Sequence, residues 1–375
     1  MKKLFAILMA VLMVCTLAGC GSKETTTTET AGDLKTVYIM GPTPDHGWTA
    51  QAGAFAERKA EEIKAAGKYN ATYMPASSGE DQVDQCNQIV ANGDAAIVVM
   101  MPIEDSAAAG QEALYAAGIP FISFDRIIES TEKYAALNTS GDNYAVGAGI
   151  AYWFQQNGMK PGDTVVVLYG DEGTVSGRRF EGFETFLEGT LAYSDEKKGS
   201  FETTEKWTAE QVKTSTGDYS VTCSWSADPT VEYLSQKFTE IIDKATANNG
   251  RLYIFSMDDE MTFGVLNALQ TQIEGTDYAQ KAEDLELYIS SIGGMQQMYD
   301  VMSGKDTTNA ATADKYFDGV MNMYFSPQMM NAVIDEALAM LNGEVTHEVG
   351  SSMFTKTFMV LPEEAGSIEG FLGNR

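Results

Sequence analysis

The sequence predicts an α/β protein with two lobes, each built around a sheet of parallel strands. Short apolar runs that are rich in β-branched residues alternate with segments of helical periodicity, a pattern typical of βαβ units. This alternation occurs in two consecutive series, and a chain of 375 residues is too long for one ordinary core. We therefore expect two similar lobes that follow each other along the chain.

The first series runs from residue 35 to Arg126. Its helical segments end at glycines such as Gly67 and Gly118, and its strand at 95–101 is fully apolar, as buried parallel strands are. The expected elements are a strand at 35–40, a helix at 47–66, a strand at 69–75, a helix at 79–91, a strand at 95–101, a helix at 104–117 and a strand from 119 that stops at Asp125.

The second series begins with a strand or crossover at 134–139. The expected elements are then helices at 144–157, 174–187, 231–247, 258–270, 295–302 and 327–341, and strands at 164–169, 201–207, 251–256, 285–292, 319–324 and 351–360. Two polar stretches do not fit the alternation. We interpret 208–229, which contains Trp225, as a long loop or insertion on the second lobe, and 305–314 as a second polar insertion.

The first 34 residues form a separate segment. Lys2 and Lys3 precede an apolar run that is too short for an ordinary membrane span, and the run ends in Leu17-Ala18-Gly19-Cys20. This resembles a bacterial lipoprotein signal at 1–19 that is cleaved to leave a lipid on Cys20; an ordinary signal peptide or an internal apolar start is the alternative. The polar stretch after Cys20, up to residue 34, has little to bury and is expected to be a disordered tether. We expect an extracytoplasmic protein that is anchored to the bacterial cell membrane by this lipid.

Charge and cysteine content exclude several classes of partner. The formal net charge of −28 argues against nucleic acid and against anionic membrane surfaces. Cys86 and Cys223 lie far apart in the sequence, so a disulfide between them is unsupported, and two cysteines do not make a zinc site. With His46 and His347 as the only histidines, we expect no metal and no cofactor.

The pair Asp125-Arg126 is the strongest functional signal in the residues themselves. It follows an apolar strand, and in open α/β sheets ligands bind at the carboxyl ends of strands. A carboxylate beside a guanidinium offers paired acceptors and forked donors, which suit a polyhydroxylated ligand. The alternative is that Asp125 caps the next segment and Arg126 is a surface charge.

Taken in order, several motifs resemble type I periplasmic sugar-binding proteins, the ribose- and galactose-type solute receptors of ABC transporters. The resemblance extends from about residue 35 to 360. The motifs are Gly118-Ile119-Pro120 with Phe124-Asp125-Arg126, then Asn138-Thr139-Ser140-Gly141-Asp142-Asn143, Gly173-Thr174 with Arg178-Arg179-Phe180-Glu181-Gly182-Phe183, Asp258-Asp259-Glu260-Met261-Thr262-Phe263-Gly264, and Ser326-Pro327.

The resemblance implies two Rossmann-like lobes joined by a three-crossing hinge, with crossings near 138–142, 324–327 and 350–354. The N-terminal lobe would comprise 35–139 and 326–352, and the C-terminal lobe 140–325 and 353–375. The ligand, a monosaccharide or related polyol, would be enclosed between the lobes, and the closed form of a monomer would be presented to the permease subunits of an ABC transporter.

The resemblance also implies ligand contacts. Asp125 and Arg126 match the family's sugar-binding pair, and either Arg179 or Arg178 matches the arginine of the second lobe, with Arg179 aligning better. Asp258 falls where relatives carry a ligand-facing Asn or Asp, although helix capping would explain it too.

Four weaker contacts complete the expected site. Trp48 is placed to stack on a sugar ring or to pack in the core, His46 to donate to a hydroxyl or to cap, and Asn138 to contact the ligand. The family's acid after the strand at 285–292 is missing, and Gln296 or a main-chain group would substitute for it. Phe325 stands where relatives often carry Gln, so ribose itself is not favoured.

Three functions are compatible with the sequence. The first is a solute-binding lipoprotein of a transporter, and the second is a sensory receptor of the same fold that feeds a membrane kinase. The third is a glycoside-acting enzyme, with Asp125, Asp258 or Asp259 as its carboxylates, but no paired carboxylate motif supports it. We predict a binding protein and not an enzyme.

Overall fold

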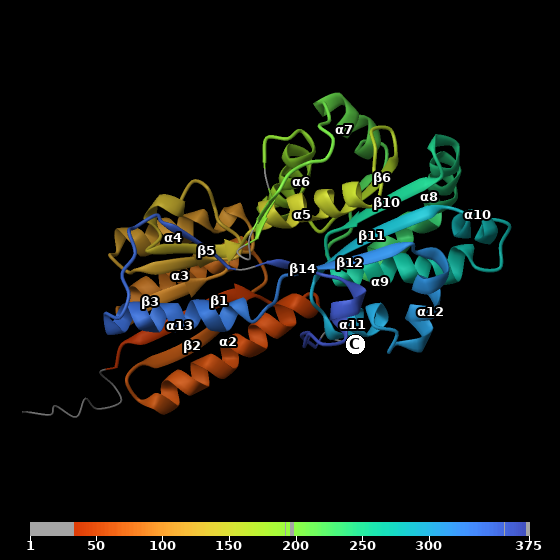
Figure 1. Ribbon diagram of the computed structural model, residues 1–375. Helices are drawn as coiled ribbons and strands as arrows, with labels where there is room; N and C mark the ends of the chain where they lie inside the picture. Colours follow the sequence, from red (N-terminus) through yellow and green to blue (C-terminus); the bar gives the residue numbers. More distant parts are fainter. Residues whose placement is uncertain (1–33, 192, 196–198, 356, 373–375) are drawn as a thin grey trace, which may run out of the picture. The chain divides into compact units, whose positions relative to one another are not determined.

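The computed structural model describes residues 34–372, apart from 192, 196–198 and 356. The predicted signal peptide, the lipid-bearing Cys20 and most of the predicted tether lie outside the described residues. Two six-stranded sheets, each flanked by helices, form the two lobes (Figure 1). The predicted α/β class with two lobes is confirmed.

The first sheet has the strand order β13-β5-β4-β3-β1-β2, with every pair parallel. Its strands and principal helices are β1 (Thr36–Pro42), α2 (Gly47–Ala66), β2 (Asn70–Ala76), α3 (Gly79–Asn92), β3 (Ala95–Met100), α4 (Ala108–Ala116), β4 (Phe121–Phe124), β5 (Leu137–Gly141), α13 (Met329–Asn342) and β13 (Ser352–Thr355).

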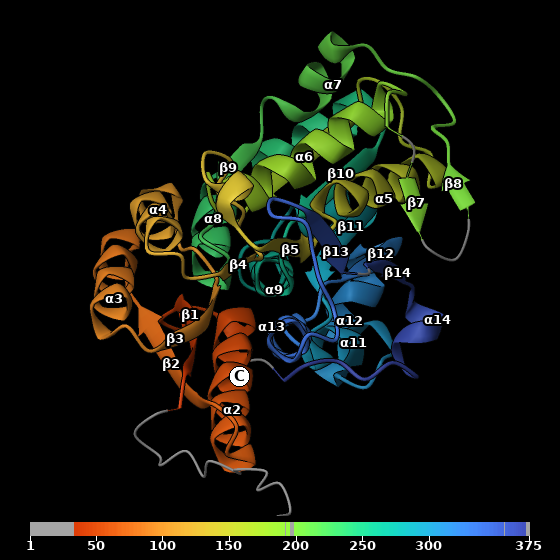
Figure 2. The ribbon, with the colours of Figure 1, turned by 90° about the vertical axis from the view of Figure 1, so that its left-hand side faces the viewer.

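Alternating side chains of β1, which lies between β3 and β2, explain why both faces of this sheet carry helices. Val37 and Ile39 belong to the cluster that includes residues of α2 and α13, whereas Tyr38 and Met40 pack with residues of α3 and α4. All four side chains are nearly inaccessible to solvent, which requires cover on both faces. Both ribbon views show α13, from the end of the chain, beside α2 (Figures 1 and 2).

The second sheet has the strand order β14-β12-β11-β10-β6-β9, and only β14 is antiparallel to its neighbour. Its strands are β6 (Thr164–Tyr169), β9 (Ser220–Thr222), β10 (Arg251–Ser256), β11 (Glu286–Gly293), β12 (Gly319–Tyr324) and β14 (Phe358–Val360). The helices of this lobe are α5 (Asn143–Gln156), α6 (Thr174–Leu187), α7 (Ala209–Thr216), α8 (Ala227–Asn248), α9 (Asp259–Ala268), α10 (Ala279–Glu283), α11 (Gln296–Met302), α12 (Thr307–Tyr316) and α14 (Pro362–Ala365). A separate hairpin pairs β7 (Tyr193–Asp195) with β8 (Gly199–Phe201).

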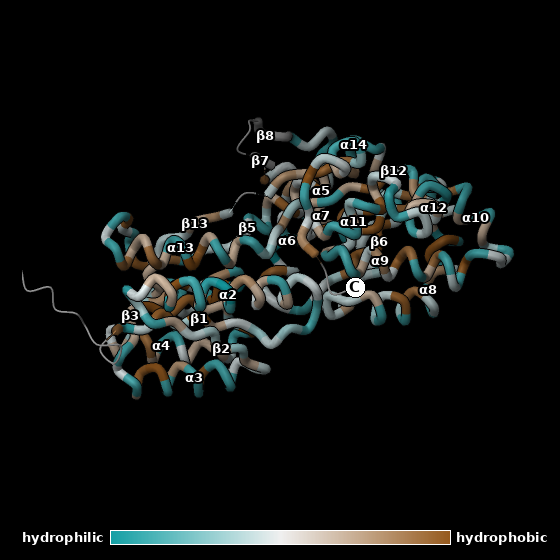
Figure 3. Tube along the Cα trace, turned by 90° about the horizontal axis from the view of Figure 1, so that it is seen from below, coloured by the Kyte–Doolittle hydropathy of each residue, from teal (hydrophilic) through white to brown (hydrophobic). Residues whose placement is uncertain are grey.

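Helices α5 and α6 approach each other so closely that glycine is required between them. A Cβ on Gly147 would lie 1.8 Å from the carbonyl oxygen of Arg179, and one on Gly182 would lie 2.2 Å from that of Tyr144. Hydropathy along the outer helices follows the usual amphipathic alternation, visible as teal and brown turns of α3 and α8 (Figure 3). The close α5–α6 contact fixes Arg179 relative to the sheet.

The last strand was predicted as one element at 351–360, and this prediction was wrong. Residues 352–355 form β13, which pairs in parallel with β5 of the first sheet, and residues 358–360 form β14 on the second sheet. The third crossing therefore follows Thr355 and does not lie at 350–354, because the backbone of β13 is committed to the first lobe. The predicted lobe boundaries shift accordingly: β5 of the first sheet continues to Gly141, and β13 keeps residues up to Thr355 there.

The structure also corrects the interpretation of the two polar stretches as insertions. The stretch 208–229 contains α7, the edge strand β9 and the start of α8; Thr208 begins α7 by accepting a hydrogen bond from the Gln211 backbone N–H. The stretch 305–314 lies mostly in α12, which Asp306 caps. The strand expected at 201–207 ends at Phe201.

Two further observations concern membrane and cysteine chemistry. Among the residues that the structure describes, no helix is both long and apolar enough to cross a bilayer. Cys86 and Cys223 are both buried and unpaired with each other.

Candidate functional site

A cavity between the two lobes is lined by side chains from the ends of strands and the starts of helices in both lobes. Because the carboxyl ends of parallel strands share one edge of a sheet, residues just after β4 and β10 and at the end of β11 meet there. The lining residues are His46, Trp48, Thr49, Met101, Asp125, Arg126, Val175, Arg179, Trp225, Asp258, Ile292, Gly293 and Phe325. Six of the nine predicted ligand-binding residues thus line one cavity.

Asp125 is the most unusual group in this cavity. It follows β4 with a φ of 64°, in the left-handed region that side chains other than glycine rarely adopt, and its N–H donates to the carbonyl of Thr139 at 2.8 Å. Its side chain is buried, and its Oδ1 has no hydrogen-bond partner among the described residues. Burial raises the pKa of this carboxyl, while the charges of Arg126 and Arg179 act in the opposite direction.

Arg179 on α6 lines the cleft and is only 4% exposed. Its Nε donates to Asn143 Oδ1 at 2.9 Å and its Nη1 to the carbonyl of Met257 at 2.7 Å. The guanidinium lies 4.7 Å from the ring centre of Phe325 and 5.5 Å from that of Trp225. Burial lowers its pKa to about 10, against the opposing charges of nearby aspartates, so the group stays cationic at neutral pH.

Asp258 and Asp259 have different roles although they are adjacent. Asp258 caps α9 by accepting from the Glu260 N–H at 2.8 Å and also lines the cavity, so capping and a ligand contact are compatible. Burial raises the pKa of Asp258 to about 8, with a further increase from Asp259 and a decrease from His46. The carboxylate of Asp259 instead accepts hydrogen bonds from residues of β11, the following turn and β12.

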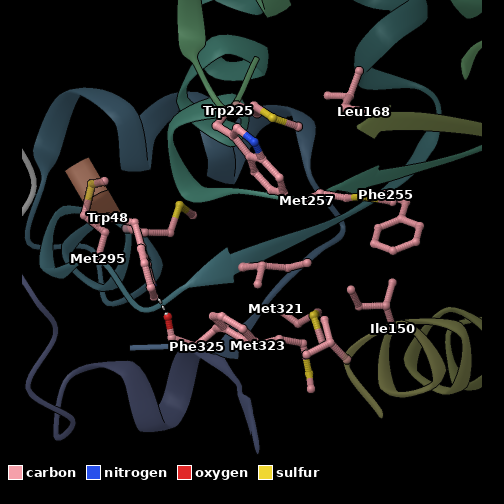
Figure 4. Packing of buried hydrophobic residues seen from close by; sticks show 14 of the residues in the cluster. Trp48, Ile150, Leu168, Trp225, Phe255, Met257, Met295, Met321, Met323 and Phe325 are labelled. Atoms are coloured by element: carbon pink, nitrogen blue, oxygen red, sulfur yellow. Dashed lines mark hydrogen bonds between the residues drawn. The ribbon is translucent and has the colours of Figure 1, made fainter. Parts of the chain in front are cut away.

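The first turn of α2 and the residue before it supply an aromatic wall. The indole N–H of Trp48 donates to the carbonyl of Phe325 at 2.8 Å, so this ring is fixed at the crossing after β12 (Figure 4). His46 bonds Asp45 Oδ1 through Nδ1 at 2.7 Å and stacks on Trp225 with 6.2 Å between ring centres. Burial alone would lower the pKa of His46, but the Asp45 bond and the charges of Asp258 and Glu260 raise it on balance.

Arg126 faces the cavity but is already engaged. Its Nη1 donates to the carbonyl of Ile103, and its Nη2 forms an ion pair with Asp171 Oδ2 at 2.9 Å. Ile103 belongs to the same lobe as Arg126, whereas Asp171 follows β6 of the other lobe.

The structure does not bring three of the predicted residues to this cavity. Arg178 and Asn138 line a separate cavity near the crossings, and the Asn138 amide donates to the carbonyl of Glu132 at 2.9 Å. Gln296 donates to Asp300 Oδ1 at 2.9 Å and accepts from the Gly370 N–H at 2.9 Å, so it secures the end of the chain. The ambiguity between the two adjacent arginines is thereby resolved geometrically: Arg179 lies in the cleft and Arg178 does not.

Sequence reasoning missed several residues of the cleft. Trp225, within the stretch interpreted as an insertion, forms part of the cavity lining. Phe325, which in the sequence is only a departure from the family pattern, lies against Arg179. Asp171 was overlooked, although it follows the apolar strand 164–169 just as Asp125 follows its own strand. That symmetry of acids after apolar strands was the signal available in the sequence.

Comparison with known proteins agrees with this geometry. The family model described as a periplasmic binding protein domain matches residues 37–344, which is most of the chain. The chain belongs to this family. The predicted resemblance is therefore confirmed, and periplasmic binding proteins act outside the cytoplasm as solute-binding components, not as enzymes. No curated protein sequence matches the chain.

Solved structures show the same fold at low sequence identity. A galactofuranose binding protein is 18% identical, with a TM-score of 0.63 over 88% of this chain and 96% of that one. The binding protein of the arabinose ABC transporter from Shewanella sp. ANA-3, bound to L-arabinofuranose, is 16% identical, with a TM-score of 0.64 over 89% and 94%. A solute binding protein from Chloroflexus aurantiacus, in complex with D-glucose, is 17% identical, with a TM-score of 0.62 over 88% and 93%.

Proposed function

We propose that the protein is the substrate-binding component of an ABC transporter and that it binds a monosaccharide or related polyol between its lobes. A lipid on Cys20 anchors it outside the cell membrane, and the closed, loaded form is recognised by the permease. The buried Oδ1 of Asp125, unpartnered among the described residues, carries this proposal. A buried carboxylate oxygen without a donor costs free energy, and a sugar hydroxyl would remove that cost.

The other groups around Asp125 suit the same class of ligand. Asp258 offers a second oxygen pair and Arg179 a cation, so hydroxyl groups would find both acceptors and a donor. The indole of Trp48 and the ring of Phe325 supply apolar surface for the C–H faces of a sugar ring. Three structural neighbours bind a galactofuranose, an arabinofuranose and a glucose, which supports a sugar as ligand.

Thermal unfolding against a panel of sugars, polyols and nucleosides tests this proposal. A ligand at about 100 times its dissociation constant adds roughly 2.7 kcal/mol to the free energy of unfolding, which is a rise of several degrees in Tm for lobes of this size. We expect one sugar or polyol to produce this rise. We also expect Asp125→Asn to abolish it and Asp277→Asn, at an exposed position, to retain it.

The outcomes separate the parts of the proposal. A rise with a nucleoside alone would keep the binding protein and overturn the sugar assignment. An unchanged rise with Asp125→Asn would overturn the role of the unpartnered carboxylate.

A further inference from the structure

One ion pair crosses between the lobes beside the cavity. Arg126 follows β4 of the first sheet and Asp171 follows β6 of the second, and their Nη2 and Oδ2 atoms lie 2.9 Å apart. The two side chains are 24% and 25% exposed, so water screens this pair less than a surface pair. The described contacts between lobes also include the Gly47 N–H, which donates to Glu260 Oε1 at 2.9 Å.

Asp171 is held rigidly by its own lobe. Its Oδ1 accepts from the Gly173 N–H at 2.9 Å and from the Ser176 hydroxyl at 3.2 Å, both at the start of α6. Its Oδ2 accepts from the indole N–H of Trp225 at 3.2 Å, in addition to the contact with Arg126. Because the carboxylate is already positioned by these bonds, pairing with the opposite lobe requires little further ordering.

The tryptophan that Asp171 holds is itself built into the fold. Trp225 has a φ of 56°, and its ring lies against Gly170, where a Cβ would come within 2.0 Å of a ring carbon. Glycine is therefore required at position 170 for this placement. The same ring faces His46 of the first lobe and the guanidinium of Arg179.

The ion pair stands at a boundary between two cavities. Arg126 and Trp225 line both the inner cavity with Asp125 and a larger outer cavity of about 730 Å³, whereas Asp171 lines only the outer one. Arg126, Asp171 and Trp225 therefore meet where the outer cavity adjoins the inner one. Separation of this group requires the ion pair to break.

We propose that Asp171 is a positioning residue for solute capture, which locks the lobes through Arg126 and fixes Trp225 over the bound solute. This inference rests on the proposed function, and it assigns Arg126 to closure rather than to contact with the solute. An ion pair that forms whenever the lobes meet stabilises the closed state with or without solute, so it slows the escape of a bound solute, while entry through the open state is little affected.

Stopped-flow kinetics with the sugar found in the thermal panel tests the lock. We expect Asp171→Asn and Arg126→Gln each to raise the dissociation rate about 10-fold and to leave the association rate within about 3-fold. The double variant should be no faster than the faster single variant, because each change removes the same interaction. Glu172→Gln, which removes the neighbouring exposed charge, should leave the dissociation rate unchanged.

Two results would overturn the lock. One is a much larger loss of affinity with Arg126→Gln than with Asp171→Asn, with effects that add in the double variant, since Arg126 would then contact the solute directly. The other is a slower association rate with an unchanged dissociation rate in Asp171→Asn.

Small-angle X-ray scattering of the ligand-free protein keeps this test separate from the proposed function. If no solute in the panel binds, the proposed function fails, but the lock still predicts a larger radius of gyration for both single variants than for the wild type. An equal radius in all three proteins would overturn the lock, whatever the solute panel shows.

Discussion

Each wall of the cleft buries an aspartate, but the two aspartates differ in their hydrogen bonds. In the C-terminal wall, Asp259 accepts four hydrogen bonds, from Ser291 Oγ at 2.5 Å, Gly294 N at 2.9 Å, Met295 N at 2.6 Å and Asn322 Nδ2 at 2.6 Å. In the N-terminal wall, the Oδ1 of Asp125 has no partner among the residues described.

Under the proposed function, this difference separates a carboxylate that holds the fold together from one that binds the solute. Asp259 ties β11 and β12 to the start of α9, so the cost of burying its charge is offset within the lobe. Asp125 has a buried carboxylate oxygen without a partner among the described residues, and a hydroxyl that donates to this oxygen would offset the cost of its burial. Burial alone therefore does not reveal function; the state of the hydrogen bonds does.

Replacing Asp259 should lower the free energy of unfolding far more than replacing Asp125. We expect Asp259→Ala to lower the free energy of unfolding by about 3–5 kcal/mol, because its buried donors lose their acceptor. Asp125→Ala should cost less than about 1 kcal/mol, because few bonds are lost. Urea unfolding monitored by circular dichroism measures both changes, and equal losses in the two variants would remove the distinction between the walls.

The second comparison is between the adjacent residues Arg179 and Arg178 and concerns the affinity for the sugar. Arg179→Gln should weaken sugar binding at least about 100-fold, because the buried acids of both walls lose their central cation. Arg178→Gln, one residue away but in the other cavity, should change affinity less than about 3-fold. Isothermal titration calorimetry compares them, and a larger loss with Arg178→Gln would reverse the assignment.

The third comparison concerns how the free energy of unfolding depends on pH. The pKa of Asp258 is raised to about 8 by burial from an ordinary value of 3.8, so the folded protein binds this proton more tightly than the unfolded chain. Its contribution to stability is then complete below about pH 4 and is lost as pH rises towards about 8. Asp258→Asn should therefore gain stability relative to the wild type across this window, by at most about 1.4 kcal/mol per pH unit. Unfolding curves at several pH values check this, and a constant difference between the two proteins would show that Asp258 is already ionised.

Much of the fold followed from the chain itself. Apolar periodicity, together with glycines at helix ends, correctly predicted the bounds of two helices and three strands. These are the helices 47–66 and 174–187 and the strands 164–169, 251–256 and 319–324. The elements that were missed are short or polar. β9, with three residues at a sheet edge, and α7, with eight residues and a small buried face, give little periodic signal.

For the site, the sequence by itself determined that an acid and a guanidinium follow β4, because local alternation of strand and helix fixes which residues end a strand. It did not determine which of Arg178 and Arg179 enters the cleft, because neighbours on a helix point about 100° apart and only packing of α6 on α5 sets the rotation. Nor did it reveal that Arg126 meets Asp171, that Trp225 covers the cavity, or that the last strand divides between two sheets. Those relations join residues far apart in the chain, and only the tertiary structure brings their side chains and backbones within bonding distance.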